Sequence, residues 1–394
     1  MLLRFPYTAN HAAAFSPNHR RCECKEDNMK RTALNSLQRA LGAAFANPAG
    51  WEMAASYGDP LAEHNAVRNG CGMTDFSSMG PIDVKGPDVA RYLNYLTVNE
   101  VADIPTGRVV YTTMLNEQGR ILDDVTVYKR ADDHYMVVTS TAKHEATLAW
   151  MKKQAEGFCV YLTDLVSAIT LICLQGPDSR EVLQKHTGYD LSKLSYFHFA
   201  EDMVAGAPTL ISRTGFTGEL GYELYVPSIM ATDVWEALLA TDDGKKVVPV
   251  GTGACGATLR LEKAYMGGAE LKDANPVELP IAWTVKLNKS SFIGKEATQE
   301  LKRNGLSRKL VGLEVIGGVP AAGARIMLDG EAVGEITSAG YGPTVGKNIA
   351  LGFVPFANSS PGSTFEVKGS DGKSLKMVVV ATPFYDPKGN RVRS

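Results

Sequence analysis

The sequence predicts an α+β protein in which a mixed body of helices and strands is followed by a separate all-β domain. In the first three quarters of the 394 residues, helix-period and alternating segments follow one another without a repeating βαβ unit, which argues against a doubly wound parallel sheet. From residue 310 to residue 384, short alternating segments are separated by turns such as LDGE, SAGYGPTVGKN and SDGK, a pattern typical of a barrel or sandwich.

The helices and strands of the mixed body are predicted from periodicity. Helical spacing predicts helices over residues 31–45, 86–96, 141–158, 177–187, 231–241 and 253–265. Alternation over residues 109–140, interrupted by the turns NEQG and ADDH, predicts a meander. A strand, a Gly-containing turn and a second strand are expected over residues 209–227.

The change in pattern after residue 305 sets the expected domain limits. We expect a tail over residues 1–30, an α+β domain of two lobes over residues 31–305, and a β-barrel domain over residues 306–394. The tail is rich in Arg and His and has no apolar central segment, so a secretory signal is not expected. A disordered tail, or a true start at Met29, is the favoured interpretation, and a transit peptide is the alternative.

Composition excludes several classes of protein. The chain is 44% hydrophobic and 21% charged with a formal net charge of -2, so binding to nucleic acid or to a membrane is not expected. The six cysteines show no zinc-binding spacing, and no metal site is predicted. Cys173 and Cys255 lie in apolar or Gly-rich surroundings that suit reduced thiols, which predicts a cytoplasmic protein.

Common catalytic motifs are absent from the sequence. It contains no phosphate-binding P-loop, no dinucleotide-binding GxGxxG after a strand, no GxSxG elbow and no HExxH. ATP, dinucleotide, serine hydrolase and zinc hydrolase chemistry therefore lose support.

Acidic residues beside turns are the features that remain. In GRILDDVTVYKR, residues 119–130, Asp123 and Asp124 stand where a turn becomes a strand, although strands are depleted in Asp. The two-residue period of a strand sends their side chains to opposite faces, so one can face solvent while the other enters a cavity. Taken alone, an acid that protects a strand edge or binds a turn amide is the commoner explanation.

A second acidic segment raises the same question. In RTGFTGELGYELYVP, Glu219 belongs to the turn, and Glu223 shares a strand face with Gly221 and Tyr225 in an apolar run. A buried acid needs hydrogen-bond donors, and a ligand rich in N–H groups could supply them.

The order of these segments resembles the aminomethyltransferase family, which contains the T-protein of the glycine cleavage system and its folate-dependent relatives. The matching segments cover about residues 50 to 385 and are GWEMAASYGD, EHNAVRNGCGMTDFSSMG, VVYTTMLNEQGRILDDVTVY, LQGPDS, TGFTGELGYELYVP, LRLEKAY, FIGKEA and TSAGYGPTVGKNIALGFVP. The resemblance implies a three-lobed cloverleaf with tetrahydrofolate in a central channel and a C-terminal β-barrel.

The resemblance also implies roles for individual residues. Asp124 matches a catalytic acid that touches the folate nitrogens, and Glu223 matches an acid that binds the pterin amine and ring N–H. Tyr111, Met79 and Phe216 match positions that contact the folate rings. Since the resemblance gives the catalytic role to Asp124, we expect its neighbour to end the turn at the surface.

The implied activity is transfer of an aminomethyl group from a lipoyl arm on a carrier protein to tetrahydrofolate, with release of ammonia. Two departures from the family pattern keep an alternative open: Ser78 stands where T-proteins usually have His, and Gly256 where they usually have Arg. The alternative is a tetrahydrofolate-dependent demethylase or methyltransferase that acts on a small N-, O- or S-methyl compound. A folate-binding assembly or regulatory protein without catalysis is an alternative of another class.

Overall fold

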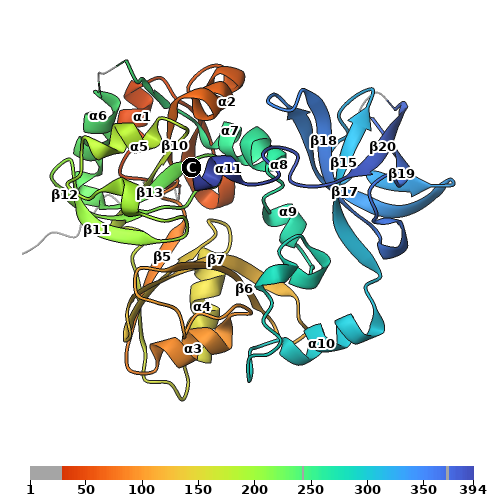
Figure 1. Cartoon of the computed structure of the whole chain (residues 1–394), viewed down its shortest axis with the longest axis horizontal. Coiled ribbons are helices and arrows are strands. Elements are labelled where there is room, and N and C mark those ends of the chain that lie inside the picture. The colour runs from red at the N-terminus through yellow and green to blue at the C-terminus, as the bar shows by residue number, and fades with distance from the viewer. Residues whose placement is uncertain (1–28, 242–243, 370–371) are drawn as a thin grey trace, which may run out of the picture.

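The computed structural model describes residues 29–241, 244–369 and 372–394, and these residues form three lobes (Figure 1). The predicted cloverleaf with its C-terminal barrel is therefore confirmed. The expected N-terminal tail lies, up to residue 28, outside the described residues. No helix in the described ranges is both long enough and apolar enough to cross a bilayer.

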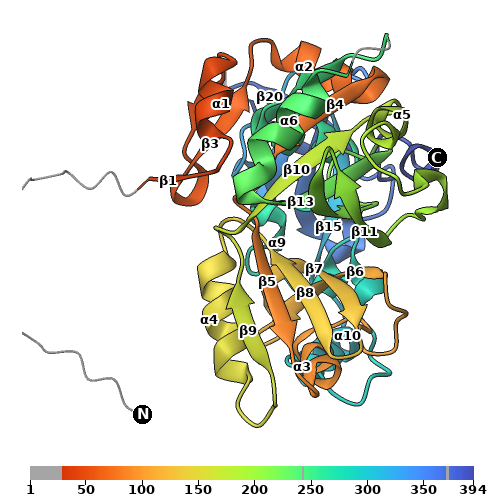
Figure 2. The same ribbon diagram turned by 90° about the vertical axis from the view of Figure 1, so that its left-hand side faces the viewer.

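The first lobe is built on a sheet that we call the β7 sheet, with strand order β6-β7-β8-β5-β9. Its strands are β5 (Gly80–Lys85), β6 (Val109–Leu115), β7 (Ile121–Ala131), β8 (His134–Thr139) and β9 (Tyr161–Asp164). The predicted meander is β6, β7 and β8. Helices α3 (Val89–Leu96) and α4 (His144–Gln154) cover one face of this sheet (Figures 1 and 2).

The second lobe is built on the β13 sheet, with strand order β11-β12-β13-β10-β4-β14. Its strands are β4 (Cys71–Asp75), β10 (Ile169–Gln175), β11 (Phe199–Val204), β12 (Ala207–Ser212), β13 (Gly221–Pro227) and β14 (Val247–Pro249). The accompanying helices are α1 (Asn35–Ala40), α2 (Pro60–Asn69), α5 (Ser179–Gln184) and α6 (Ala231–Leu239). A small sheet of β1 (Lys30–Arg31), β3 (Trp51–Ser56) and β2 (Ala44–Ala46) precedes it.

The third lobe is a closed barrel with strand order β15-β18-β17-β16-β19-β20. Its strands are β15 (Arg308–Ile316), β16 (Arg325–Leu328), β17 (Glu331–Gly342), β18 (Lys347–Pro355), β19 (Thr364–Lys368) and β20 (Ser374–Val380). Closure removes the unpaired strand edges that an open sheet of this kind would expose.

The connecting elements run between the lobes. A helical segment of α7 (Thr252–Ala254), the π-turn η4 (Cys255–Leu259) and α8 (Arg260–Glu262) leads through α9 (Gly268–Leu271) and α10 (Lys295–Asn304) to the barrel. After β20 the chain returns to the second lobe and ends with α11 (Asn390–Arg393), as Figure 1 shows.

The helix predicted over residues 31–45 is wrong in extent. The observed helix α1 spans only Asn35–Ala40, and Ala44–Ala46 form strand β2, which pairs with β3. Gly42 adopts a left-handed φ of 82°, a conformation that commonly ends a helix because glycine has no Cβ to oppose it.

The first two lobes meet through apolar side chains of both sheets. The β7 sheet contributes Val109, Tyr128, Met136 and Val138, and the β13 sheet contributes Leu171, Cys173, Phe199, Leu210 and Tyr225. Burying a side chain of this size removes it from water at a gain of about 1.5–3 kcal/mol. The face of the β7 sheet opposite to α3 and α4 is thus held against the second lobe.

Candidate functional site

Strand β7 presents its two acids to different surroundings. Val125 and Val127, which share a face with Asp123, pack in the core with Leu148 and Met151 of α4. Asp124 lies on the other face, which is turned toward the second lobe. The alternation predicted from the sequence is confirmed.

Asp124 is partly exposed and is held by one neighbouring strand. Tyr111 on β6 lies opposite Thr126 of β7, and its hydroxyl donates to Asp124 Oδ2 at 2.9 Å. Burial raises the pKa of Asp124, and the hydrogen bond from Tyr111 opposes that rise. No other side chain of the described residues donates to Asp124, so the carboxylate keeps acceptor sites for a ligand.

Asp123 is not a surface turn residue, and the expectation that it ends the turn is wrong. Its side chain is buried, with 2% exposure, and it lies inside β7, which begins at Ile121. The turn is closed earlier by Asn116, whose side-chain oxygen accepts from the Arg120 N–H at 2.9 Å. Because Asn116 already closes the turn, the acid is available to the interior.

The buried Asp123 carboxylate is satisfied by hydroxyl and amide donors. Ser140 donates from Oγ at 2.6 Å and from its N–H at 3.3 Å, and Thr147 of α4 donates from Oγ1 at 3.0 Å. Burial, with the nearby charge of Asp124, raises the pKa of Asp123 to about 7 despite these donors.

Glu223 lies on β13, the strand of the second lobe that faces Asp124's side of the β7 sheet. Its Oε2 accepts from Thr214 Oγ1 at 2.6 Å and from the hydroxyls of Tyr128 and Tyr225 at 3.4 Å each. The donors that we expected from a ligand are thus supplied in part by the protein. All of these bonds reach Oε2, which leaves Oε1 as an acceptor, and burial raises the pKa of Glu223.

The hydroxyl pair Tyr128–Tyr225 fixes the distance between the two acids. These hydroxyl oxygens lie 2.9 Å apart across the junction of the lobes. Tyr128 is on the same face of β7 as Asp124, four residues along, which at a rise of about 3.3 Å per residue is about 13 Å. Because Tyr128 also reaches Glu223, Asp124 and the Glu223 cluster are separated by about this length of β7.

The other predicted residues lie around these acids. Met79 packs against the cluster that contains Tyr128 and Tyr225. Phe216 lies in the loop between β12 and β13, two residues after Thr214, and its ring stacks on Tyr265 with centroids 6.0 Å apart and an interplanar angle of 22°. The structure therefore brings Asp124 together with Tyr111, brings Met79 to the cluster around Tyr128 and Tyr225, and stacks Phe216 on Tyr265.

Tyr128, Thr214 and Tyr265 were not predicted as site residues. Tyr128 could have been found, because the two-residue period puts it on the face of Asp124. Tyr265 follows α8 and reaches Phe216 only through the tertiary fold, for which the sequence carries no local signal.

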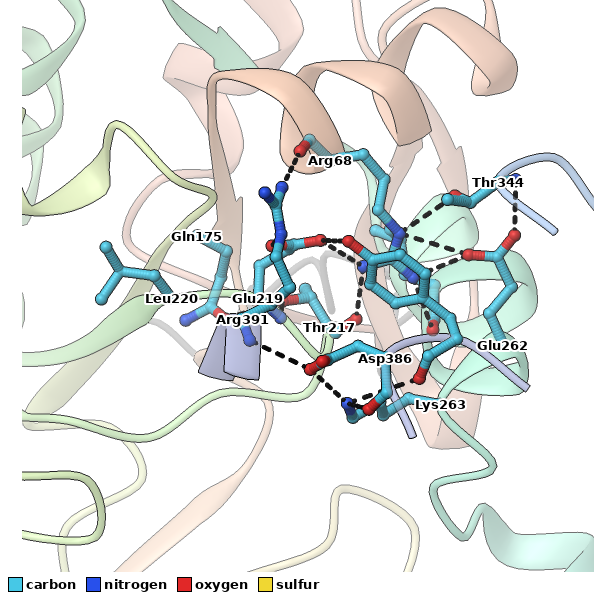
Figure 3. Close-up of polar contacts among 12 residues, drawn as sticks. Arg68, Gln175, Thr217, Glu219, Leu220, Glu262, Lys263, Thr344, Asp386 and Arg391 are labelled. Atoms are coloured by element: carbon cyan, nitrogen blue, oxygen red, sulfur yellow. Dashed lines mark hydrogen bonds and ion pairs between the residues drawn. The ribbon is translucent and has the colours of Figure 1, made fainter. Parts of the chain in front are cut away.

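A buried ionic network supports the loop that carries Phe216 (Figure 3). Arg68 of α2, with 2% side-chain exposure, pairs with Glu219 at 3.2 Å and with Glu262 of α8 at 2.8 Å. It also donates to the Thr217 carbonyl at 2.8 Å. Glu219, which the sequence indicated only as a turn residue, is therefore bound to α2 directly and, through Arg68, to α8.

The C-terminal segment completes this network from the barrel side. The Tyr385 hydroxyl donates to Glu219 at 2.6 Å, and Arg391 donates to the other Glu219 oxygen at 2.9 Å. Lys263 pairs with Asp386 at 2.9 Å beside them (Figure 3). The segment that follows the barrel thus holds the Phe216 loop through the buried Glu219, whose partner Arg391 is itself 43% exposed.

Comparison with known proteins agrees with this fold. Residues 34–289 match the family model described as the GCVT N-terminal domain, and residues 308–386 match the glycine cleavage T-protein C-terminal barrel domain. A solved structure, the glycine cleavage system aminomethyltransferase T from Bartonella henselae, superposes with a TM-score of 0.85 at 31% identity, covering 91% of this chain and 99% of that one.

Curated relatives are similar over nearly their whole length. An aminomethyltransferase of Desulfitobacterium hafniense is 38% identical over 364 residues, covering 92% of this chain and 99% of the relative. An aminomethyltransferase of Listeria monocytogenes is 41% identical over 360 residues, covering 90% and 98%. The chain therefore belongs to the aminomethyltransferase family of glycine cleavage T-proteins.

The ionic network predicts a large cost for removing its cation. Arg68→Met leaves Glu219 and Glu262 buried without their shared partner, and we expect a loss of about 3–5 kcal/mol in the free energy of unfolding. Urea unfolding measures this loss. The matched control is Arg91→Met, because Arg91 is 63% exposed and pairs with Asp88 at the surface, where a loss below about 1 kcal/mol is expected. Equal losses in the two variants would contradict the structural role of the network.

The raised pKa of Asp123 predicts a pH-dependent difference in stability. Its pKa rises from the usual 3.8 to about 7 on folding, so the folded state binds the proton more tightly than the unfolded state. This stabilisation is complete below about pH 4 and is lost as the pH rises through about 7. Asp123→Asn does not titrate, so between pH 4 and 7 it should gain stability relative to the natural protein, on the order of a few kcal/mol.

Urea unfolding at intervals from pH 4.5 to 7.5 checks this difference. Thr209→Val, which changes a buried side chain that does not titrate, is the control, and its free energy of unfolding should follow the same pH dependence as that of the natural protein. A parallel course for Asp123→Asn as well would show that Asp123 is ionised over this whole range.

Proposed function

We propose that this protein is a tetrahydrofolate-dependent aminomethyltransferase of the glycine cleavage type. The observation that carries the proposal is the pair of partly exposed acids on facing strands, Asp124 with one side-chain donor and Glu223 with a free Oε1. The aminomethyltransferase relatives and the Bartonella henselae structure support the same activity.

The residues present fit a reduced folate. Glu223 Oε1 can accept the N–H groups of the pterin edge, since its other oxygen already binds the donors of the protein. Met79, Tyr111 and Phe216 supply polarisable and aromatic surfaces for flat rings. Asp124 lies further along the facing strand, where the nitrogens that accept the one-carbon unit would lie.

When bound, tetrahydrofolate supplies the nucleophilic nitrogen of the reaction. Asp124 orients this nitrogen and stabilises the positive charge that develops on it during attack. Tyr111 holds the carboxylate in place through its 2.9 Å hydrogen bond, so the charge is aimed before the reaction begins. Burial around Asp124 strengthens this interaction, because less water competes for the carboxylate.

We propose that the donor is an aminomethyl group on the lipoyl arm of a carrier protein, from which ammonia is released. We also propose a cytoplasmic location, supported by the buried free thiols of Cys71, Cys173 and Cys255 in the described residues. Neither nucleic acid nor a membrane is a partner in this proposal.

One observation favours a second candidate donor. A Cβ atom at Gly256 would meet no atom within 4 Å, and Ser78, also a small residue, bonds Thr141 Oγ1 at 2.9 Å. The open space at Gly256 could admit a small N-, O- or S-methyl compound, which would make the protein a demethylase with the same folate site. Turnover with each class of donor distinguishes the two candidates.

Asp124→Asn and Glu223→Gln should separate chemistry from binding. Asp124→Asn should lower kcat at least about a hundredfold, because removing one preorganised charge at the reacting centre costs several kcal/mol of barrier. Glu223→Gln should weaken tetrahydrofolate binding by about 1.5–3 kcal/mol. The glutamine has no charge, and its amide N–H would face the N–H groups of the pterin, which are also donors.

Calorimetric titration with tetrahydrofolate measures the binding, and ammonia release from aminomethyl-lipoyl carrier protein measures the turnover. A flat titration of the natural protein at millimolar tetrahydrofolate would refute the folate site. If tetrahydrofolate binds but no donor is turned over, and if Asp124→Asn leaves the binding unchanged, a non-catalytic folate-binding protein would be favoured.

A further inference from the structure

Strand β7 loses a neighbouring strand where it carries its two acids. Pairing with β8 ends at Thr126 and Val138, whereas pairing with β6 continues through Asp124 and Asp123. Extending the β8 register by two residues on each strand would put Ser140 beside Asp124. That part of the ladder is not formed, and the Ser140 N–H donates to Asp123 Oδ2 instead, at 3.3 Å. The Asp123 side chain takes the place of a backbone partner at this point.

The same carboxylate joins β7 to helix α4. Thr147, in the first turn of α4, donates to Asp123 Oδ2 at 3.0 Å, and the Ser140 hydroxyl donates to Oδ1 at 2.6 Å. Asp123 forms no ion pair within the described ranges. Because only 2% of it is exposed to solvent, its carboxylate depends on these donors for hydrogen bonds. The hydrogen bonds therefore fasten β7 from the face opposite to Asp124.

We propose that Asp123 is a positioning residue of the one-carbon transfer, which fastens β7 to Ser140 and α4 and so fixes the direction in which Asp124 projects. The inference rests on the proposed function for the chemistry at Asp124. The Cα atoms of Asp123 and Asp124 are about 3.8 Å apart across a planar peptide. Backbone motion at Asp123 therefore moves Asp124 as well. A displacement of about 1 Å at a reacting group can cost about a hundredfold in rate.

A set of variants separates the hydrogen bonds from the charge. Asp123→Asn can place its amide oxygen at the Oδ2 position, where it accepts from the Ser140 N–H and from Thr147, and can donate its amide N–H to Ser140 Oγ, so it removes the charge and retains the contacts. Asp123→Ala removes all of the contacts, and Thr147→Val removes one hydroxyl at nearly constant volume. The matched control is Thr209→Val on β12, a buried hydroxyl that donates to the Ala207 carbonyl at 3.0 Å. Thr209 faces away from the junction of the lobes, into which its neighbour Leu210 packs.

Steady-state kinetics with tetrahydrofolate should show a change in kcat without a matching change in KM. For Asp123→Ala and Thr147→Val, we expect kcat to fall at least about tenfold while KM and the calorimetric Kd for tetrahydrofolate stay within about threefold. Asp123→Asn and Thr209→Val should keep both constants within about threefold of the natural protein. Hydrogen exchange of the backbone amides of residues 121–126 should be faster in Asp123→Ala and Thr147→Val than in the other two variants.

The possible outcomes decide between the alternatives. Unchanged kcat in Asp123→Ala would overturn the inference, and so would an Asp123→Asn variant as impaired as Asp123→Ala, because charge and not fastening would then matter. A natural protein that binds tetrahydrofolate but turns over no donor would refute the proposed function. In that case the hydrogen-exchange comparison would decide by itself whether Asp123 fastens β7.

Discussion

The contact between Tyr128 and Tyr225 is the interaction on which the arrangement of the site depends. Their hydroxyls join the β7 sheet to the β13 sheet at 2.9 Å, and both also reach Glu223. A buried hydroxyl without a partner costs about 1–3 kcal/mol. The two sheets are therefore held in the relative position in which both tyrosine hydroxyls keep their hydrogen bonds. With that relation fixed, the position of Asp124 follows from the rise of β7. The distance between the two acids is thus set by strand geometry and not by a flexible loop.

The barrel contributes to the site through the segment that follows its last strand. Its C-terminal segment brings Tyr385 and Arg391 to Glu219, and the strongly buried Arg68 holds the same acid from the second lobe (Figure 3). The buried Arg68 and Glu219 are expensive to separate, because each has lost hydration that only its partners replace. The loop with Phe216 is therefore held, through Thr217 and Glu219, by α2 and by the segment that follows the barrel.

The sequence predicted the fold class, the meander and the alternation at Asp123 and Asp124, because these depend on local periodicity. It failed for Asp123, where a turn closed by Asn116 and a strand ladder that ends at Thr126 made the acid an interior residue. It also missed the donors of Glu223, since Tyr128 lies 95 residues away and meets it only when the lobes assemble. Helix α1 was predicted too long because the left-handed conformation of Gly42 is not visible in a helical pattern of leucines.

A crystal structure of the protein with a bound reduced folate tests the central claim most directly. The account predicts the pterin N–H edge within about 3.2 Å of Glu223 Oε1 and a folate nitrogen that accepts the one-carbon unit within hydrogen-bond distance of Asp124. It also predicts that the Tyr128–Tyr225 contact persists in the complex. A folate bound elsewhere, or bound with Glu223 and Asp124 both in contact only with protein groups, would contradict the account.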